Sequence, residues 1–441
     1  MLFLVLMATL AVGFAAATTM NAQIAKNERA MNQARAAADG GMQFVRYQLG
    51  QMGLASTVQT SGLMDAVAQA LGQQLNGTPN MNGHTVQNSG GIIYLPSASS
   101  WMTVDPGPGT RFRAQITQSG QFLVVTTTGS GQATATASAK AIQIQYQKAP
   151  KAGAILNYGV ASKGTISTGG STLIQGQTDP TKGSVFSADM SSSTPVSIGG
   201  QGITGDVSVV NPNAIVSGGP IGGTSDPVQI QKHIHLGVPP PVFPTVDISV
   251  FTAYATNRYT GGNTLTNCYI PPNTNPKFAG GSTINGVLWI QAPNVVTFRG
   301  NCTINGVIVC DTSGPFDPVN NQLSFAGNVS ATPVQDLDPN VYGGLTKLTG
   351  AFMLAPTYYV SMTGDFGTIG GSAVVGQLSM TGNAHGTVQG SVIGMTDKPM
   401  TLNGHASITI SSTGTSNYPS GMSFGNAYTP LPGTYLEVTP P

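Results

Sequence analysis

The chain opens with MLFLVLMATLAVGFAAATTMNAQIA, residues 1–25, a run that contains no ionisable side chain. The first charged residue is Lys26. As an α-helix rising ~1.5 Å per residue the run would be ~37 Å long, which exceeds the ~30 Å hydrocarbon core of a bilayer. We therefore expect the chain to begin as a helix that is buried in a membrane or inside a protein assembly.

A cleavable secretory signal is the alternative interpretation of this run. Ala15-Ala16-Ala17 offers an A-x-A cleavage pattern after an apolar segment. A signal peptide also has a basic segment before its apolar core, and no basic residue precedes this run. We favour a retained helix with a permanent structural role.

Charged residues are scarce along the whole chain. Asp, Glu, Lys and Arg make up 7% of the 441 residues, against ~25% in ordinary soluble domains. The net charge of +1 gives no electrostatic reason to expect a nucleic-acid partner. The 58 glycines, with Thr, Ser, Asn and Val in short alternations, are typical of a β-rich fold with many tight turns.

Residues 1–52 are predicted to form one long helix, apolar in its first half and amphipathic in its second. From Ile24 onward, apolar residues recur at helical spacing, at Ile24, Met31, Ala34, Ala38, Met42, Val45 and Leu49. Residues 53–150 are predicted to form a small domain of their own. It has a helix at 62–75 and, from the two-residue alternation at 111–147, a three-stranded antiparallel sheet.

Repeats dominate the rest of the chain. The segment Phe278-Ala-Gly-Gly-Ser-Thr-Ile-Asn-Gly-Val returns as Phe298-Arg-Gly-Asn-Cys-Thr-Ile-Asn-Gly-Val. Val360-Ser-Met-Thr-Gly-Asp likewise returns as Leu378-Ser-Met-Thr-Gly-Asn. A period of about 20 residues with glycine corners is typical of one coil of a parallel β-solenoid. A β-sandwich with glycine-rich turns is the alternative.

The predicted fold class is therefore α+β. It comprises a long N-terminal helix, a small antiparallel sheet and a large all-β domain, which we interpret as a parallel β-helix. We assign this β-solenoid to residues 151–415, with a proline-rich excursion at 237–262. Residues 416–441 are expected to form an irregular tail.

Three cysteines lie close together in this domain, and we expect a disulfide between two of Cys268, Cys302 and Cys310. The spacing leaves the connectivity open. No CxxC motif is present, so a thiolate metal site is not expected.

Two common motifs of catalytic chemistry are missing from the sequence, which contains no HExxH and no Walker loop. Asp336-Leu-Asp338 is the closest pair of acids in the repeats, and we interpret it as a solvated turn before Pro339. His233-Ile-His235 would place two imidazoles on one face of a strand, but no third metal ligand is evident. We expect no catalytic residue, no cofactor and no metal.

The N-terminal layout resembles type IV pilin-like proteins, especially the PilX-like minor pilins. Asn27-Glu28-Arg29-Ala30 leads into Ala36-Ala37-Ala38-Asp39-Gly40-Gly41, which resembles the family's AAEAG segment with Asp39 in place of the glutamate. The resemblance covers residues 1–50, with weaker support from the sheet. Val5 stands where major pilins usually carry a glutamate that pairs with a neighbouring N-terminus.

The resemblance implies a structural, non-enzymatic subunit of an extracellular or cell-surface pilus-like filament that serves adhesion. Its implied partners are identical subunits, the inner membrane before assembly and type IV pilus-like assembly machinery. The implied assembly-helix residues are Met1, Leu2, Phe3, Leu4, Val5, Leu6, Met7, Leu10 and Phe14. Candidates for ion pairs between subunits are Lys26, Glu28, Arg29, Arg35 and Asp39. The alternative is a membrane-tethered β-helix that binds or cleaves extracellular polysaccharide.

Overall fold

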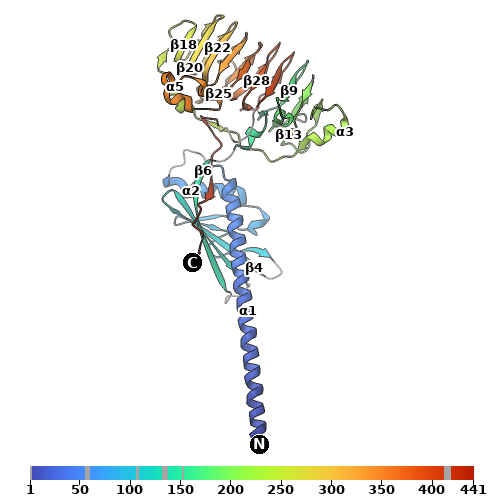
Figure 1. Ribbon diagram of the computed structural model, residues 1–441, viewed down its shortest axis with the longest axis vertical. Coiled ribbons are helices and arrows are strands. Elements are labelled where there is room, and N and C mark those ends of the chain that lie inside the picture. The colour runs from blue at the N-terminus through green and yellow to red at the C-terminus, as the bar shows by residue number, and fades with distance from the viewer. Residues whose placement is uncertain (1, 55–59, 106–108, 132–137, 151–152, 412–418) are drawn as a thin grey trace. The chain divides into compact units, whose positions relative to one another are not determined.

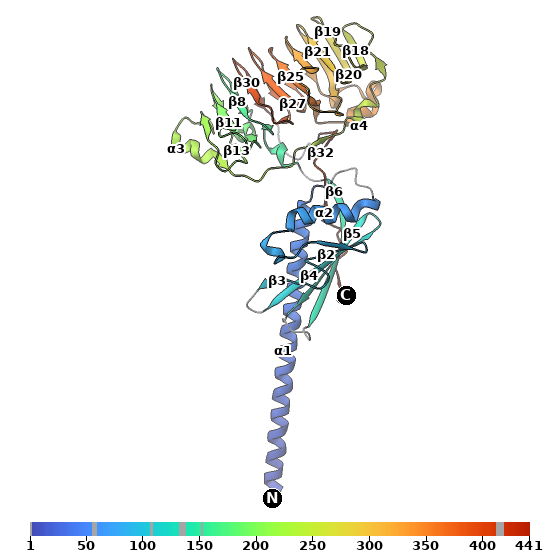
Figure 2. The ribbon, with the colours of Figure 1, turned by 180° about the vertical axis from the view of Figure 1, so that it is seen from behind.

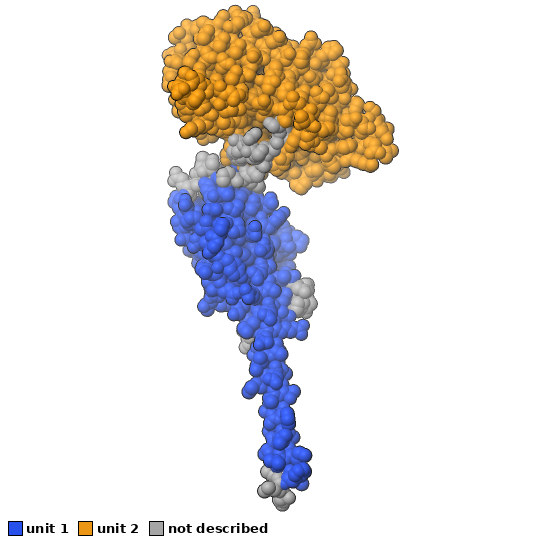
Figure 3. Space-filling model, in the orientation of Figure 1, with its two compact units in different colours: residues 1–151, 425–441 blue, residues 152–424 orange. Residues whose placement is uncertain are grey.

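The computed structural model describes residues 2–54, 60–105, 109–131, 138–150, 153–411 and 419–441. The chain divides into two compact units, residues 1–151 with 425–441 and residues 152–424, which Figure 3 colours separately. The first unit contains the long helix and an antiparallel sheet, and the second contains parallel strands. The α+β class predicted from the sequence is confirmed.

The first unit is organised around helix α1 (Leu2–Gln51), which is continuous through Gly40-Gly41 (Figure 1). Its described side chains, which leave out those of Leu2 and Val5, are exposed as far as Arg29. From Ala30 onward one face is buried, at Ala30, Ala34, Ala37, Ala38, Met42, Val45 and Leu49. The C-terminal half of α1 therefore packs on the unit, while the N-terminal half extends beyond it.

The buried face of α1 packs on an eight-stranded sheet with the order β1-β2-β4-β5-β6-β33, in which β3 also pairs with β4 and β34 with β6. Helix α2 (Leu63–Leu75), close to the predicted 62–75, contributes Val67 and Leu71 to the same core. The strands are β1 (Gln87–Ser89), β2 (Ile92–Leu95), β3 (Met102–Asp105), β4 (Thr110–Ser119), β5 (Phe122–Ser130), β6 (Ala139–Pro150), β33 (Asn426–Pro430) and β34 (Leu436–Val438).

The C-terminal segment corrects the prediction of an irregular tail. Strands β33 and β34 both pair antiparallel with β6, and Asn426 lies opposite Pro150. Leu54 and Asn426 also exchange two backbone hydrogen bonds, of 3.0 and 2.7 Å. Short strands rich in proline give little alternation, so the sequence pattern alone does not reveal them. The second unit is thus an insertion between two paired strands of the first.

The second unit is a stack of parallel strands (Figure 2). Strand β20 pairs with β22 along its full length, from Ser282 opposite Cys302 to Ile290 opposite Cys310. The two sequence repeats that begin at Phe278 and Phe298 therefore lie in register on neighbouring strands of the stack. Phe278, Phe298 and Phe325 stack inside successive coils with ring centroids 4.9 Å apart.

The strands form three runs along the stack. The first run is β15 (Ile234–Leu236), β13 (Val207–Val209), β10 (Val185–Ser187), β7 (Val160–Ser162), β29 (Val392–Gly394), β27 (Ser372–Met380), β25 (Ala351–Met362), β22 (Cys302–Cys310), β20 (Ser282–Ile290), β18 (Thr264–Ile270) and β17 (Asn257–Arg258). The second is β14 (Val216–Gly218), β11 (Val196–Ile198), β8 (Ile166–Thr168), β30 (Met400–Leu402), β27, β25, β23 (Asn321–Phe325), β21 (Asn294–Phe298) and β19 (Lys277–Phe278). The third is β12 (Gly202–Ile203), β9 (Leu173–Gly176), β31 (Ser407–Ile410), β28 (His385–Val388) and β26 (Gly367–Ile369), and β24 (Val329–Thr332) pairs with β22.

The chain does not follow the stack from one end to the other. It enters in the middle at β7 and coils outward to β15, then crosses through residues 237–256 to β17 and coils back. The two sections meet where β29, β30 and β31 pair in parallel with β7, β8 and β9. The predicted excursion is therefore the connection between two sections that dock end to end.

This connection covers one outer face of the stack. Val309, Leu354 and Val374 follow one another in register and are fully or almost fully buried. They belong to a second core that includes Phe251 and Phe424, separate from the core inside the coils. The remaining elements are α3 (Pro227–Ile230), α4 (Ser249–Thr252), α5 (Pro339–Tyr342), β16 (Thr245–Val246), β32 (Met422–Ser423), and the 3₁₀ helices η1 (Thr60–Gly62), η2 (Pro79–Met81), η3 (Ala154–Asn157), η4 (Pro180–Gly183), η5 (Gln231–His233), η6 (Val334–Asp336) and η7 (Gly343–Lys347).

Candidate assembly surface

The N-terminal half of α1 presents large apolar side chains to solvent. Met1 lies outside the described residues, as do the side chains of Leu2 and Val5. The other predicted assembly residues are strongly exposed, with relative exposures of 71% for Phe3, 75% for Leu4, 59% for Leu6, 55% for Met7, 50% for Leu10 and 68% for Phe14. An apolar surface of this extent marks an interaction site in a folded protein.

The hydroxyl groups in this half are satisfied within the helix. Thr9 donates to the carbonyl of Leu6 (2.8 Å), Thr18 to Phe14 (2.8 Å) and Thr19 to Ala15 (2.7 Å). A polar group that already has a hydrogen-bond partner can be buried without an unmet donor. The surface of residues 2–20 is therefore suited to burial against apolar side chains.

The inner-membrane segment predicted at residues 1–25 is not supported. Within the described part of the chain, no helix combines the length and the mean hydropathy of a membrane span.

The C-terminal half of α1 approaches the sheet closely because small residues line both surfaces. A Cβ atom at Gly129 would overlap the carbonyl oxygen of Ala34 and the amide nitrogen of Ala38, and one at Gly131 would overlap the carbonyl of Ala30. Buried Thr127 donates to the carbonyl of Ala38 at 3.0 Å. These contacts fix the helix on β5, so its exposed half extends from a defined base.

The predicted ion-pair residues divide into two groups. Lys26, Glu28 and Arg29 are exposed, and no described salt bridge contains them. Arg35, in contrast, has a partner in the same chain: its Nη2 lies 2.8 Å from Glu437 Oε1. A hydrogen bond with Tyr435 and the charge of Glu437 raise the pKa of Arg35, and Asp39 adds a smaller electrostatic effect. Neither Tyr435 nor Glu437 was expected at this site, because both lie in the segment predicted to be irregular.

The cysteines correct another expectation. All three are buried free thiols. Cys302 and Cys310 lie at opposite ends of β22. Cys268 lies in β18 in register with Leu288, which is itself in register with Ile308. The structure contains no disulfide among these three residues, contrary to the expectation.

The candidate chemical residues of the second unit form small polar clusters. The carboxylate of Asp206 is hydrogen-bonded to both histidines of the His233-Ile-His235 segment. Its Oδ1 lies 2.7 Å from His233 Nδ1, and its Oδ2 lies 3.1 Å from His235 Nε2. Asp338 caps helix α5 by accepting a hydrogen bond from the amide of Asn340 at 2.9 Å. No group of three or more His, Cys, Asp or Glu suited to a metal ion occurs among the described residues.

A column of hydroxyl side chains follows the second run of strands. Each member lies in register with the next and, apart from the last, between two buried residues of its own strand, so it points outward. Hydrogen bonds of 3.1 to 3.2 Å join Ser324 to Ser361, Ser379 to Thr401 and Ser197 to Ser217. In stack order the column is Thr297, Ser324, Ser361, Ser379, Thr401, Ser167, Ser197 and Ser217.

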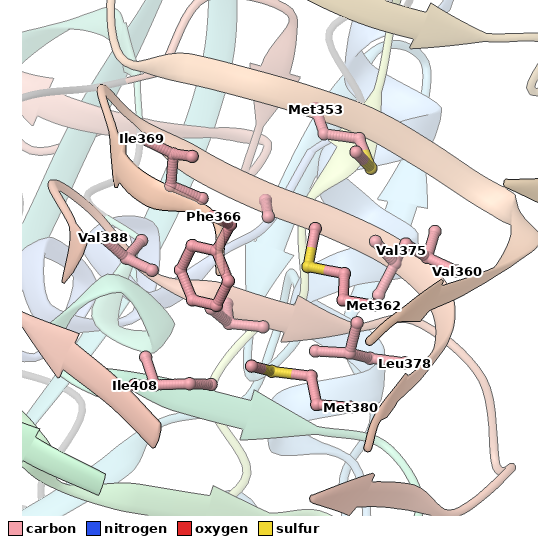
Figure 4. A pocket seen from close by; sticks show the side chains of 12 residues that line it. Met353, Val360, Met362, Phe366, Ile369, Val375, Leu378, Met380, Val388 and Ile408 are labelled. Carbon is pink, nitrogen blue, oxygen red and sulfur yellow. The ribbon is translucent and has the colours of Figure 1, made fainter. Parts of the chain in front are cut away.

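A cavity inside the coils has no polar lining. It measures about 20 Å³ and lies among side chains such as Met353, Phe366 and Met380 (Figure 4). A buried water requires two or more polar partners, and every lining residue is apolar. The cavity is a packing defect of the core rather than a binding site.

No protein-family model and no curated protein matches this chain. Among solved structures, the crystal structure of the competence-associated pilin ComZ from Thermus thermophilus is matched with 12% sequence identity and a TM-score of 0.24. The match covers 93% of this chain and 97% of that chain. A likeness at this score carries no argument about fold or function.

Proposed function

We propose that this chain is a structural subunit of an extracellular type IV pilus-like filament and has no enzymatic activity. Its N-terminal helices would pack against those of identical copies in the filament core, and the two β-rich units would form the outer shell. The observation that carries the proposal is the exposed apolar half of α1, which extends from a helix fixed on its own sheet. The pilin resemblance of residues 1–50 supports the same arrangement.

Burial of this surface supplies the driving force. Apolar surface removed from water contributes roughly 25 cal/mol per Å², and α1 offers large exposed side chains from Phe3 to Ile24. Copies of the same helix are the matching partner because their hydroxyl groups are also satisfied internally. Exposed Lys26, Glu28 and Arg29 then lie at the base of the apolar half, where opposite charges of neighbouring copies can pair.

The register of the helices has to come from shape and from these charges. Val5 carries no carboxylate, so the glutamate pairing implied by the family resemblance has no counterpart at this position. Lys26, Glu28 and Arg29 provide both signs of charge within one helical turn, and Asp39 adds a further carboxylate. Assembly by type IV pilus-like machinery belongs to this proposal.

The hydroxyl column favours a second candidate function, binding of a neutral extracellular polysaccharide. Adjacent parallel strands lie ~4.8 Å apart, so the column offers hydroxyl groups at regular intervals along the stack. A polymer of neutral sugars presents matching hydroxyl groups at its own regular spacing. This activity would be compatible with a filament whose outer shell contains the second unit.

The filament proposal is tested with the double variant Leu6→Asp, Leu10→Asp. Two carboxylates at exposed positions should leave the monomer folded but prevent burial of the helix, so negative-stain microscopy should show no filaments. Val319→Asp is the matched control, because Val319 is 70% exposed on the second unit. Filaments that persist in the double variant would refute the proposal.

A further inference from the structure

The two ends of the parallel stack are closed to different degrees. At the end formed by β17 and β18, the residues of the inner columns are buried, with exposures of 5% for Leu265, 4% for Cys268 and 0% for Ile270. Tyr259 packs its ring edge-on against Phe278, 5.6 Å between centroids, next to the same end. This end is covered by the chain's own residues.

At the opposite end the inner columns are open. Val207 and Val209 of β13 are fully buried, and their partners in register are Ile234 and Leu236 of β15. Ile234 is half-buried and Leu236 is 44% exposed. Val216 of β14 is likewise half-buried, although its partner Val196 is fully buried. The hydrophobic interior therefore reaches the surface where the stack stops.

The short helix α3 covers this end only in part, and it lies at the extremity of the stack opposite β18 in both ribbon views (Figures 1 and 2). Ile230 packs inward against the core of the coils, but Val228 is 67% exposed and Ile215 is 62% exposed. We define the open end as Ile215, Val216, Val228, Ile234 and Leu236.

The open end also has unpaired strand edges. Among the described strands, β15 pairs only with β13 and β14 pairs only with β11. The outward backbone groups of both strands are therefore available to another strand. The bonds from Asp206 to His233 and His235 tie the segment that leads into β15 to the coil beneath it, so this edge is held in place.

The open end carries charges of both signs, which could pair with the same charges of a second copy. Asp226 precedes α3 and Lys232 follows it, and both side chains are exposed. Lys232 donates to Gln229 at 2.9 Å, and no described salt bridge contains either charge. A two-fold axis between Asp226 and Lys232 would place Asp226 of each copy against Lys232 of the other and the apolar residues of the two copies against each other.

We propose that the open end docks onto the same end of a second copy of this chain. The two β15 strands would run antiparallel across the contact, while Leu236 and Val228 of each copy are buried. The chain already joins two coil sections end to end, at β7–β29 and β8–β30. A two-fold contact closes on itself, so it would join subunits in pairs, including subunits of two different filaments.

The test measures self-association of the full-length chain by sedimentation over a range of concentrations. The chain carries the substitutions Leu6→Asp and Leu10→Asp, so that association through α1 does not contribute. We expect a monomer–dimer equilibrium. Leu236→Asp should raise the dissociation constant at least tenfold, because it places a carboxylate at the centre of the contact. Val319→Asp should leave it unchanged.

A charge exchange keeps the proposal testable if Leu236→Asp disturbs folding. Lys232→Glu alone and Asp226→Lys alone should each weaken dimerisation several-fold, whereas an equimolar mixture of the two variants restores both opposite-charge contacts and should recover dimers. A monomer at every concentration, or a dimer indifferent to both sets of variants, would overturn the proposal. Filaments of otherwise unmodified Leu236→Asp protein should form normally but not associate laterally, which separates this inference from the filament proposal.

Discussion

Arg35 on α1 pairs with Glu437 on β34, with 2.8 Å between Nη2 and Oε1, although the two residues lie at opposite ends of the sequence. The contact joins the base of the exposed helical half to the last strand of the sheet. It removes Arg35 from the charges that are free for contacts between copies, and leaves Lys26, Glu28 and Arg29 in that role.

This pair should contribute modestly to stability because both side chains are about half exposed. Glu437→Gln should lower the melting temperature slightly at low salt, and the difference should shrink at high salt as the charges are screened. A double-mutant cycle with Arg35→Gln, followed by thermal unfolding, measures the coupling. A coupling that does not depend on salt would contradict an electrostatic contact.

The close approach of α1 to β5 should make Gly129 intolerant of a side chain. In Gly129→Ala the new methyl group would overlap the backbone of Ala34 and Ala38, so we expect a loss of ~1–3 kcal/mol in the free energy of unfolding. Gly50→Ala is the control, since a methyl group there meets nothing within 4 Å. In the last turn of α1, it should be neutral or stabilise by up to ~1 kcal/mol. Equal effects of the two substitutions in denaturant titrations would contradict the packing described.

The buried cysteines predict a loss of stability at alkaline pH. Burial raises the pKa of Cys268 to about 11 and that of Cys302 to about 12, and it raises the pKa of Cys310 well above its usual value. An unfolded thiol ionises near pH ~8.5. The stabilisation is therefore complete below that pH and is lost as pH rises toward the folded-state values, at up to ~1.4 kcal/mol per pH unit for each thiol.

Denaturant titrations between pH 8 and pH 11 measure this slope. Cys302→Ala should reduce the slope of the free energy of unfolding against pH by the contribution of one thiol. This reduction does not depend on how much stability the substitution loses at neutral pH. In the folded protein all three thiols should react slowly with a thiol reagent. Rapid reaction of any of them at pH 8 would show that it is not buried as described.

Deletion of the second unit should leave the first unit able to fold. Pro150 lies directly opposite Asn426, so replacing residues 151–425 by a two-residue Asn-Gly turn would convert β6 and β33 into an ordinary hairpin. We expect the shortened chain to fold cooperatively and to retain α1. Removing residues 426–441 as well should destabilise it by leaving an edge of β6 uncovered. Circular dichroism melting curves distinguish these outcomes, and an unfolded hairpin variant would contradict the division into two units.

The sequence predicts well the elements that have a strong local period. Met42, Val45 and Leu49 mark the buried face of α1 as expected, and Phe278 and Phe298 occupy equivalent places in successive coils. The helix is continuous at Gly41, where the missing side chain accommodates the ring of Phe112.

Features that depend on distant parts of the chain could not be predicted. Nothing local to Glu437 indicates a partner at Arg35, and the strands β33 and β34 become recognisable only through pairing with β6. The second coil section runs back to meet the first, which brings Val392 beside Val160. The repeat pattern of the sequence would be the same without this return, so it could not reveal it. The exposed interior at Leu236 follows from that topology, since it marks where the stack stops.

A helical reconstruction by cryo-electron microscopy would show whether the exposed half of α1 forms the core of a filament. We expect filaments of the full-length chain in which residues 2–29 of neighbouring copies pack around the axis, with Phe3, Leu6 and Leu10 buried between them. A filament in which this segment lies on the outer surface would contradict the filament proposal. The absence of filaments under assembly conditions would contradict it as well.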